Sequence, residues 1–124
     1  MSASIKILVI DDEPAIRKLL RVCLESEGYQ VGEAATAHDG LREAVSFRPE
    51  LVILDGATSA LDEGGEARLM ATLVATLEGS TLISVGLRPG LEALHDRKLV
   101  LSRGERGAHL ASVPLRPATV SRNP

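Results

Sequence analysis

The stretch ILVIDDEPAIRKLL, residues 7–20, decides how this chain folds. Its first four residues are apolar and run into Asp11 and Asp12, a pattern typical of a strand that is buried on both faces of a parallel sheet. Pro14 then suits the first turn of a helix, whose apolar residues recur every three or four positions up to a stop at Gly28. The stretch therefore predicts a β-strand followed by a helix that packs back onto it.

The same alternation continues toward the C-terminus. We expect strands over 30–35, 51–54, 81–85 and 98–102, helices that begin near Thr36 and Gly65, and a hairpin turn over 104–107 that leads into a strand over 108–113. Strands that alternate with helices imply right-handed βαβ units. The predicted fold class is α/β, a flavodoxin-like, doubly wound three-layer sandwich with a parallel sheet ordered 2-1-3-4-5 and an extra antiparallel edge strand. In this prediction residues 1–113 are one domain, and residues 114–124 are a disordered or loosely packed tail.

The composition is that of an ordinary globular domain. The formal net charge of −3 provides no basic field that would gather nucleic acid. The single cysteine, Cys23, rules out an internal disulfide, and its spacing among leucines predicts a buried packing residue. Arg17, Lys18 and Arg21 of the same helix are expected on a solvated face.

No apolar stretch has transmembrane length, and the N-terminus does not look like a signal peptide. We therefore expect a cytoplasmic protein, and we expect that it was produced by recombinant expression. We expect no nucleic acid, no membrane and no other specific partner, although edge strands leave self-association open.

Three carboxylates follow the carboxyl ends of two predicted strands. Asp11 and Asp12 end the first strand, and Asp55 ends the strand over 51–54. If these strands are neighbours, the carboxylates converge at the sheet edge where open α/β folds bind ligands. Without a cation they repel one another and at least one pKa rises, so a divalent metal would relieve the repulsion. The alternative interpretation is a solvated acidic rim in which Asp12 caps a helix.

The first fifty-five residues resemble a response-regulator receiver domain, most closely the regulators of the winged-helix transcription-factor type. The resemblance rests on residues 7–20 and on PELVILD, residues 49–55. It implies that Asp11, Asp12 and Asp55 form a Mg²⁺ pocket with the backbone carbonyl of Ala57, and that Asp55 accepts a phosphoryl group as an acyl phosphate.

The receiver machinery is incomplete in this sequence. The family carries a Ser or Thr at the end of its fourth strand and a Lys at the end of its fifth. The fourth strand ends near Val85, so only Ser84 or Thr58 could supply the hydroxyl, and Arg103 is the candidate charge partner at the fifth. We therefore expect phosphorylation of Asp55 to be inefficient.

The second half resembles the Walker B, D-loop and switch-loop part of an ABC transporter ATPase. LDGATSALD, residues 54–62, is similar to the family's LDEATSALD, and the resemblance continues to about residue 113. Gly56 stands where the family has its catalytic Glu, and Leu87 stands where it has its switch His. The chain also lacks a phosphate-binding loop and an LSGGQ signature, so we expect no ATP hydrolysis.

Asp55 is shared by both resemblances, and a crossover at that strand would preserve the βαβ rhythm. We therefore expect an engineered chimera, receiver-like over 1–55 and ATPase-like over 56–113. It would be a designed scaffold, not an enzyme, with no evolved catalytic function and no required cofactor. The alternative is a residual receiver that binds Mg²⁺ and is phosphorylated at Asp55. A nucleotide-binding ATPase fragment is a third hypothesis, and the absent phosphate-binding loop argues against it.

Overall fold

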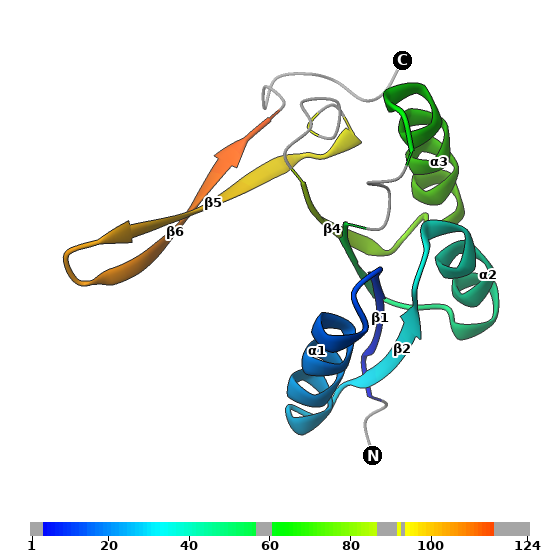
Figure 1. Cartoon of the computed structure of the whole chain (residues 1–124), viewed down its shortest axis with the longest axis horizontal. Helices are drawn as coiled ribbons and strands as arrows, with labels where there is room; N and C mark the ends of the chain where they lie inside the picture. Colours follow the sequence, from blue (N-terminus) through cyan, green and yellow to red (C-terminus); the bar gives the residue numbers. More distant parts are fainter. Residues whose placement is uncertain (1–3, 57–60, 87–91, 93, 116–124) are drawn as a thin grey trace. The chain divides into compact units, whose positions relative to one another are not determined.

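The computed structural model of the chain describes residues 4–56, 61–86, 92 and 94–115. The chain divides into two compact units, Met1–Gly86 and Leu87–Pro124. The first unit alternates strands and helices, and the second holds a hairpin (Figure 1). In chain order the elements are β1 (Lys6–Asp11), α1 (Pro14–Ser26), β2 (Gln30–Ala34), α2 (Ala37–Phe47), β3 (Leu51–Asp55), α3 (Glu63–Thr76), β4 (Thr81–Val85), β5 (Arg97–Gly104) and β6 (Gly107–Pro114). The prediction of one hybrid domain over 1–113 stays a prediction.

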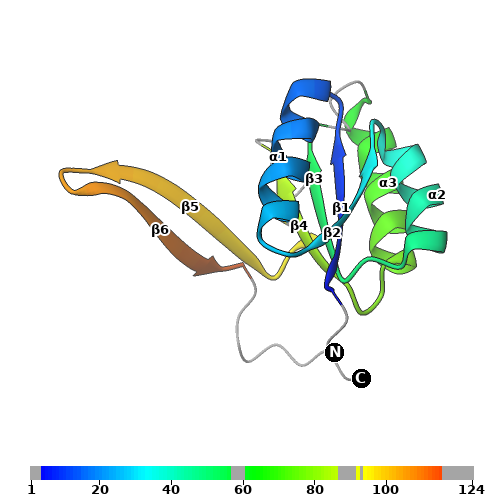
Figure 2. The ribbon, with the colours of Figure 1, turned by 90° about the horizontal axis from the view of Figure 1, so that it is seen from below.

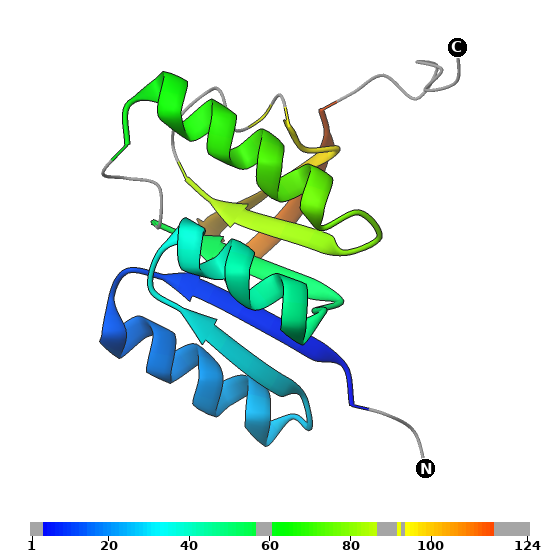
Figure 3. The ribbon, with the colours of Figure 1, turned by 90° about the vertical axis from the view of Figure 1, so that its right-hand side faces the viewer.

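The four strands of the first unit form one parallel sheet in the order β2-β1-β3-β4 (Figure 3). Helix α1 covers one face of this sheet, and α2 and α3 cover the other (Figure 2). The central strand β1 is apolar from Ile7 to Ile10, as expected of a strand with helices on both faces. The predicted α/β sandwich and the order of its first four strands are therefore confirmed.

Side chains of successive strand residues alternate between the two faces of the sheet. Ile10 faces α2, because a Cβ atom at Gly40 of that helix would overlap the Cδ1 atom of Ile10. Its neighbours Val9 and Asp11 therefore face α1. Asp11 and Asp55 are register partners on adjacent strands, so Asp55 shares the α1 face.

The hydrophobic core of the first unit lies mainly between the sheet and the α2–α3 layer. Its largest fully buried side chains come from two strands and from α3; they are Ile7, Leu8, Val9, Ile10, Val52, Met70 and Leu73. No residue of α1 reaches this degree of burial. Cys23 of α1 is exposed, so the prediction of a buried packing residue is wrong. Cys23 does lie among leucines at helical spacing, but no described residue buries the face of α1 that carries it.

The helix boundaries follow local chemistry. Pro14 stands in the first turn of α1, and Gly28 follows that helix with a φ of +94°, a left-handed conformation that favours glycine. The side chain of Thr36 caps α2 by accepting a hydrogen bond from Asp39 N at 3.0 Å. Asp62 caps α3 in the same way, with Gly65 N donating at 2.7 Å. Helix α3 therefore begins at Glu63, two positions before the predicted start.

The second unit contains an antiparallel hairpin of β5 and β6. The predicted turn over 104–107 and the strand that follows it are confirmed, and Gly107 has a φ of +105°. The predicted fifth parallel strand is wrong, because β5 pairs with β6 in a separate two-stranded sheet. A tight turn brings the two strands together directly, whereas a parallel fifth strand needs a long crossover connection.

Of the predicted tail over 114–124, only the first two residues are described. Pro114 ends β6, and Leu115 N donates a hydrogen bond to Asp96 O at 3.0 Å. Residues 116–124 lie outside the described residues. None of the helices in the described ranges has the length and apolarity needed to cross a membrane.

Candidate functional site

The carboxyl edge of the parallel sheet brings Asp11 and Asp55 together. Each residue ends its strand, and the two are register partners, as the sequence predicted. Asp11 is 2% exposed, which is unusual for a carboxylate. Its Oδ1 atom accepts a hydrogen bond from Glu13 N at 2.9 Å, whereas its buried Oδ2 atom has no hydrogen-bond partner in the described residues. A buried carboxylate oxygen without a donor is costly unless a ligand satisfies it.

Asp55 is half-buried, and its environment disfavours the charged form. Burial, and then the charges of Asp11 and Asp12, raise the pKa of the Asp55 carboxyl above its ordinary value. The charges of Asp11 and Asp12 therefore act on Asp55, and the sequence predicted that at least one pKa of this group would rise.

Asp12 approaches the same edge from the exposed loop after β1. A Cβ atom at Gly56 would lie 3.2 Å from Asp12 Oδ1, so this carboxylate lies directly beside the backbone that follows β3. Gly56 itself has a φ of +70°, a left-handed conformation that favours glycine. The local backbone thus provides a reason for glycine at position 56 that does not depend on a lost catalytic glutamate.

The residues at this edge fit a divalent cation. The described residues contain no group of three His, Cys, Asp or Glu side chains placed to hold a metal by themselves. Mg²⁺ does not require such a group, because it keeps several water ligands and is commonly held by one or two carboxylates. The unpartnered Oδ2 atom of Asp11 and the mutual repulsion at Asp55 are the two observations that favour a cation. The ligand set Asp11, Asp12 and Asp55 stays a prediction.

The structure does not place every predicted partner of Asp55 beside that residue. Val85 is the register partner of Asp55 on β4, whereas Ser84 pairs with Leu54 and so belongs to the opposite face of the sheet. Thr58, Ala57 and Leu87 lie outside the described residues. Arg103 belongs to β5 of the second unit, and its role as a charge partner stays a prediction.

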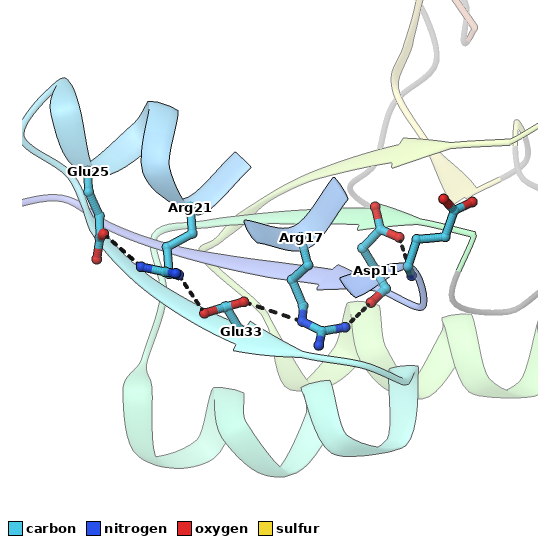
Figure 4. Close-up of polar contacts among 6 residues, drawn as sticks. Asp11, Arg17, Arg21, Glu25 and Glu33 are labelled. Carbon is cyan, nitrogen blue, oxygen red and sulfur yellow. Dashed lines mark hydrogen bonds and ion pairs between the residues drawn. The ribbon is translucent and has the colours of Figure 1, made fainter. Parts of the chain in front are cut away.

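A polar network on the α1 face was missed by sequence reasoning (Figure 4). Arg17 Nη1 donates a hydrogen bond to Asp11 O at 2.8 Å, and Arg17 Nε lies 3.3 Å from Glu33 Oε1. Arg21 Nε lies 2.9 Å from Glu33 Oε2 without hydrogen-bond alignment, and Arg21 Nη1 lies 3.3 Å from Glu25 Oε1. Arg17 and Arg21 are therefore not part of a freely solvated face. The sequence signal was Glu33, an acidic residue within the short strand β2.

Comparisons with known proteins support a response regulator receiver domain in the N-terminal part of the chain. Residues 7–63 match the family described as "Response regulator receiver domain". The KDP operon transcriptional regulatory protein KdpE of Escherichia coli is 49% identical over 49 residues, which are 40% of this chain and 22% of that protein. The transcription regulator BvgA of Bordetella pertussis is 45% identical over 58 residues, which are 46% of this chain and 28% of that protein. The chain thus spans about a quarter of the length of these curated relatives.

Solved structures show the same fold. The chemotaxis protein CheY4 of Vibrio cholerae matches with a TM-score of 0.59 at 20% identity, over 74% of this chain and 78% of that one. A crystal structure of the histidine kinase ThkA in complex with the response regulator TrrA matches with a TM-score of 0.53 at 30% identity, over 64% of this chain and 66% of that one. The first unit therefore has the flavodoxin-like receiver fold.

Two expectations from the sequence are overturned by these comparisons. The chain is not a designed scaffold, because its N-terminal part matches a natural signalling family and natural regulators at high identity. The expectation of no specific partner and no nucleic acid is also wrong, since the relatives are transcriptional regulators and a matching structure is a complex with a histidine kinase.

The ATPase-like interpretation of the second half gained no support. The family match ends at residue 63, and the comparisons show neither an ATPase half nor a chimera. In the described residues of the second unit, the strands form only the β5–β6 hairpin. The interpretation of Gly56 and Leu87 as positions of a lost nucleotide site is therefore unsupported.

Proposed function

We propose that the first unit is a phosphoacceptor receiver of two-component signalling, with Asp55 as the residue that is phosphorylated. The observation that carries the proposal is the register pairing of Asp55 with Asp11, whose buried Oδ2 atom lacks a hydrogen-bond donor. The receiver fold and the family match at residues 7–63 support it.

The chemistry is a single phosphoryl transfer to a side chain. A carboxylate oxygen of Asp55 forms a bond to phosphorus, and the bond from phosphorus to the donor's leaving group breaks, so that the leaving group departs with its electron pair. Mg²⁺, when bound, would neutralise charge on the carboxylates and on the phosphoryl oxygens. Asp11 and Asp12 would hold it, and the protein would act as a stoichiometric acceptor rather than as an enzyme.

The proposed partners follow from the relatives. A histidine kinase is the proposed phosphodonor, by analogy with the ThkA–TrrA complex. Control of transcription is the proposed output of the whole protein, by analogy with KdpE and BvgA. A cytoplasmic location is part of the same proposal. Transfer should be slow, because Val85 stands beside Asp55 where a hydroxyl would assist.

The test is intact-protein mass spectrometry after incubation with acetyl phosphate, with Mg²⁺ or with EDTA. We expect one phosphoryl adduct that requires Mg²⁺ and is absent from Asp55→Asn. The matched control is Glu50→Gln, which removes a carboxylate just before the other end of β3 and should leave the adduct unchanged. An adduct that persists in Asp55→Asn, or no adduct in a protein that unfolds cooperatively, would contradict the proposal.

A further inference from the structure

Asp11 has three oxygen atoms, one in the backbone and two in the side chain, and two of them accept hydrogen bonds. Its backbone oxygen accepts a hydrogen bond from Arg17 Nη1 at 2.8 Å, and its Oδ1 atom accepts one from Glu13 N at 2.9 Å. The third oxygen, Oδ2, is buried and has no hydrogen-bond partner in the described residues. Two contacts thus determine where the remaining oxygen lies.

Arg17 is itself held from three directions. Its side chain is only 20% exposed, and its Nε atom lies 3.3 Å from Glu33 Oε1 on β2. Its backbone N donates to Glu13 O at 3.0 Å in the first turn of α1. Glu33 also lies 2.9 Å from Arg21 Nε, so a second arginine fixes its carboxylate (Figure 4). Arg17 therefore ties the end of β1 to α1 and to β2.

Arginine is suited to this position because its planar guanidinium can use two nitrogens at once. Nη1 reaches the carbonyl of Asp11 while Nε pairs with Glu33. A lysine ammonium is a single point on a flexible stem, so it can make one of these contacts but not both in the same geometry.

We infer that Arg17 is a positioning residue for the cation site, and that it sets the affinity for Mg²⁺ by fixing the end of β1 at Asp11. The inference rests on the proposed function, because that function places Mg²⁺ at Asp11. A guanidinium is positively charged and would not be a ligand of the cation, so Arg17 would act through the backbone oxygen of Asp11 and through the pairing with Glu33.

A positioning role of Arg17 and a purely electrostatic role predict opposite changes in Mg²⁺ affinity when Arg17 is removed. Arg17 is a cation beside an acidic edge, so its charge alone opposes the binding of Mg²⁺, and removing that charge would tighten binding. Loss of positioning instead lets Asp11 move and weakens binding, as observed when partners in the outer shell of metal sites are removed. The sign of the change therefore distinguishes the two roles.

The experiment measures the Mg²⁺ dissociation constant of the full chain by isothermal titration calorimetry. We expect Arg17→Met to weaken binding about tenfold, at the low end of the range for outer-shell partners. Arg17→Lys should recover part of this loss. The matched control is Arg21→Met, which removes the same charge from the same helix and from the same partner Glu33, although Arg21 has no hydrogen bond or ion pair with β1 in the described residues. It should weaken binding less than Arg17→Met does, because Arg21 is linked to the end of β1 only through Glu33.

The outcomes separate this inference from the proposed function. If the unaltered chain does not bind Mg²⁺, the proposed function fails and the inference fails with it. If it binds Mg²⁺ and Arg17→Met binds equally well or more tightly, only the inference is overturned. If Arg17→Met does not fold, Glu33→Gln is the deciding variant, because it keeps Arg17 but removes the charge that holds it. Weaker binding of Mg²⁺ by Glu33→Gln, by less than about tenfold, supports the inference. An unchanged dissociation constant overturns it.

Discussion

The two sides of the parallel sheet differ in how deeply their helices are buried. On the side covered by α2 and α3, Met70 and Leu73 of α3 are fully buried. On the opposite side, no residue of α1 is buried. The α1 side also becomes more exposed across the sheet. Val9 of β1 is completely buried there, but Ile83 and Val85 of β4 are 38% and 56% exposed. The α1 side carries Asp11, Asp55 and the Arg17–Glu33 pair. The comparison indicates that the α2–α3 side provides most of the stability and that the α1 side carries the candidate functional residues.

The largest expected effect compares one leucine from each side. Leu73→Ala should lower the free energy of unfolding by about 2–4 kcal/mol, because it leaves a cavity in a closely packed core. Leu19→Ala on α1 should cost less than about 1 kcal/mol, because Leu19 is 57% exposed. Urea unfolding at 25 °C measures both values. Equal losses would show that the α1 side is packed as tightly as the other.

A second prediction concerns the stability cost of the acidic edge. The pKa of Asp55 is raised in the folded state, so without metal the folded protein holds this proton more tightly than the unfolded chain does. The free energy of unfolding should therefore fall as the pH rises from the ordinary aspartate range through the raised pKa of Asp55. We expect Asp55→Asn to lose this dependence and, in EDTA at neutral pH, to be more stable by less than about 1 kcal/mol, since the site is partly solvated.

Urea unfolding in EDTA across the acidic and neutral range checks this prediction. Glu50→Gln is the control, and it should keep the pH dependence of the unaltered chain. Adding Mg²⁺ at neutral pH should stabilise the unaltered chain and should do less for Asp55→Asn. A pH dependence that is identical in Asp55→Asn would mean that the repulsion at this edge does not affect folding.

The smallest expected effect is at Cys23. Because this thiol is exposed on α1, a thiol reagent should modify it in the native protein at a rate comparable to that in the urea-unfolded chain. Cys23→Ser should change the free energy of unfolding by less than about 0.5 kcal/mol. Strong protection of the native thiol would show that another surface covers this side of α1, and the comparison between the two sides would need revision.

Much of the first unit could be predicted from local patterns. The apolar run that ends in Asp11, the turn at Gly28 and the cap at Thr36 are each set by residues close together in the chain, so α1, α2 and their strands were predicted near their observed bounds. Parallel pairing then placed Asp11 beside Asp55. The place of β5 could not be predicted in the same way, because a strand pattern does not reveal its partner.

The sequence by itself determined the strand–helix alternation, the carboxylates at the ends of β1 and β3, and the left-handed glycines that follow α1 and α3. These depend on periodicity and on backbone sterics, which act over a few residues. Only the tertiary structure decided that the β5–β6 hairpin forms a sheet of its own, that Cys23 is exposed and that Arg17 reaches Asp11 and Glu33 together. These depend on which surfaces meet, and that is settled by packing and charge between segments far apart in the chain.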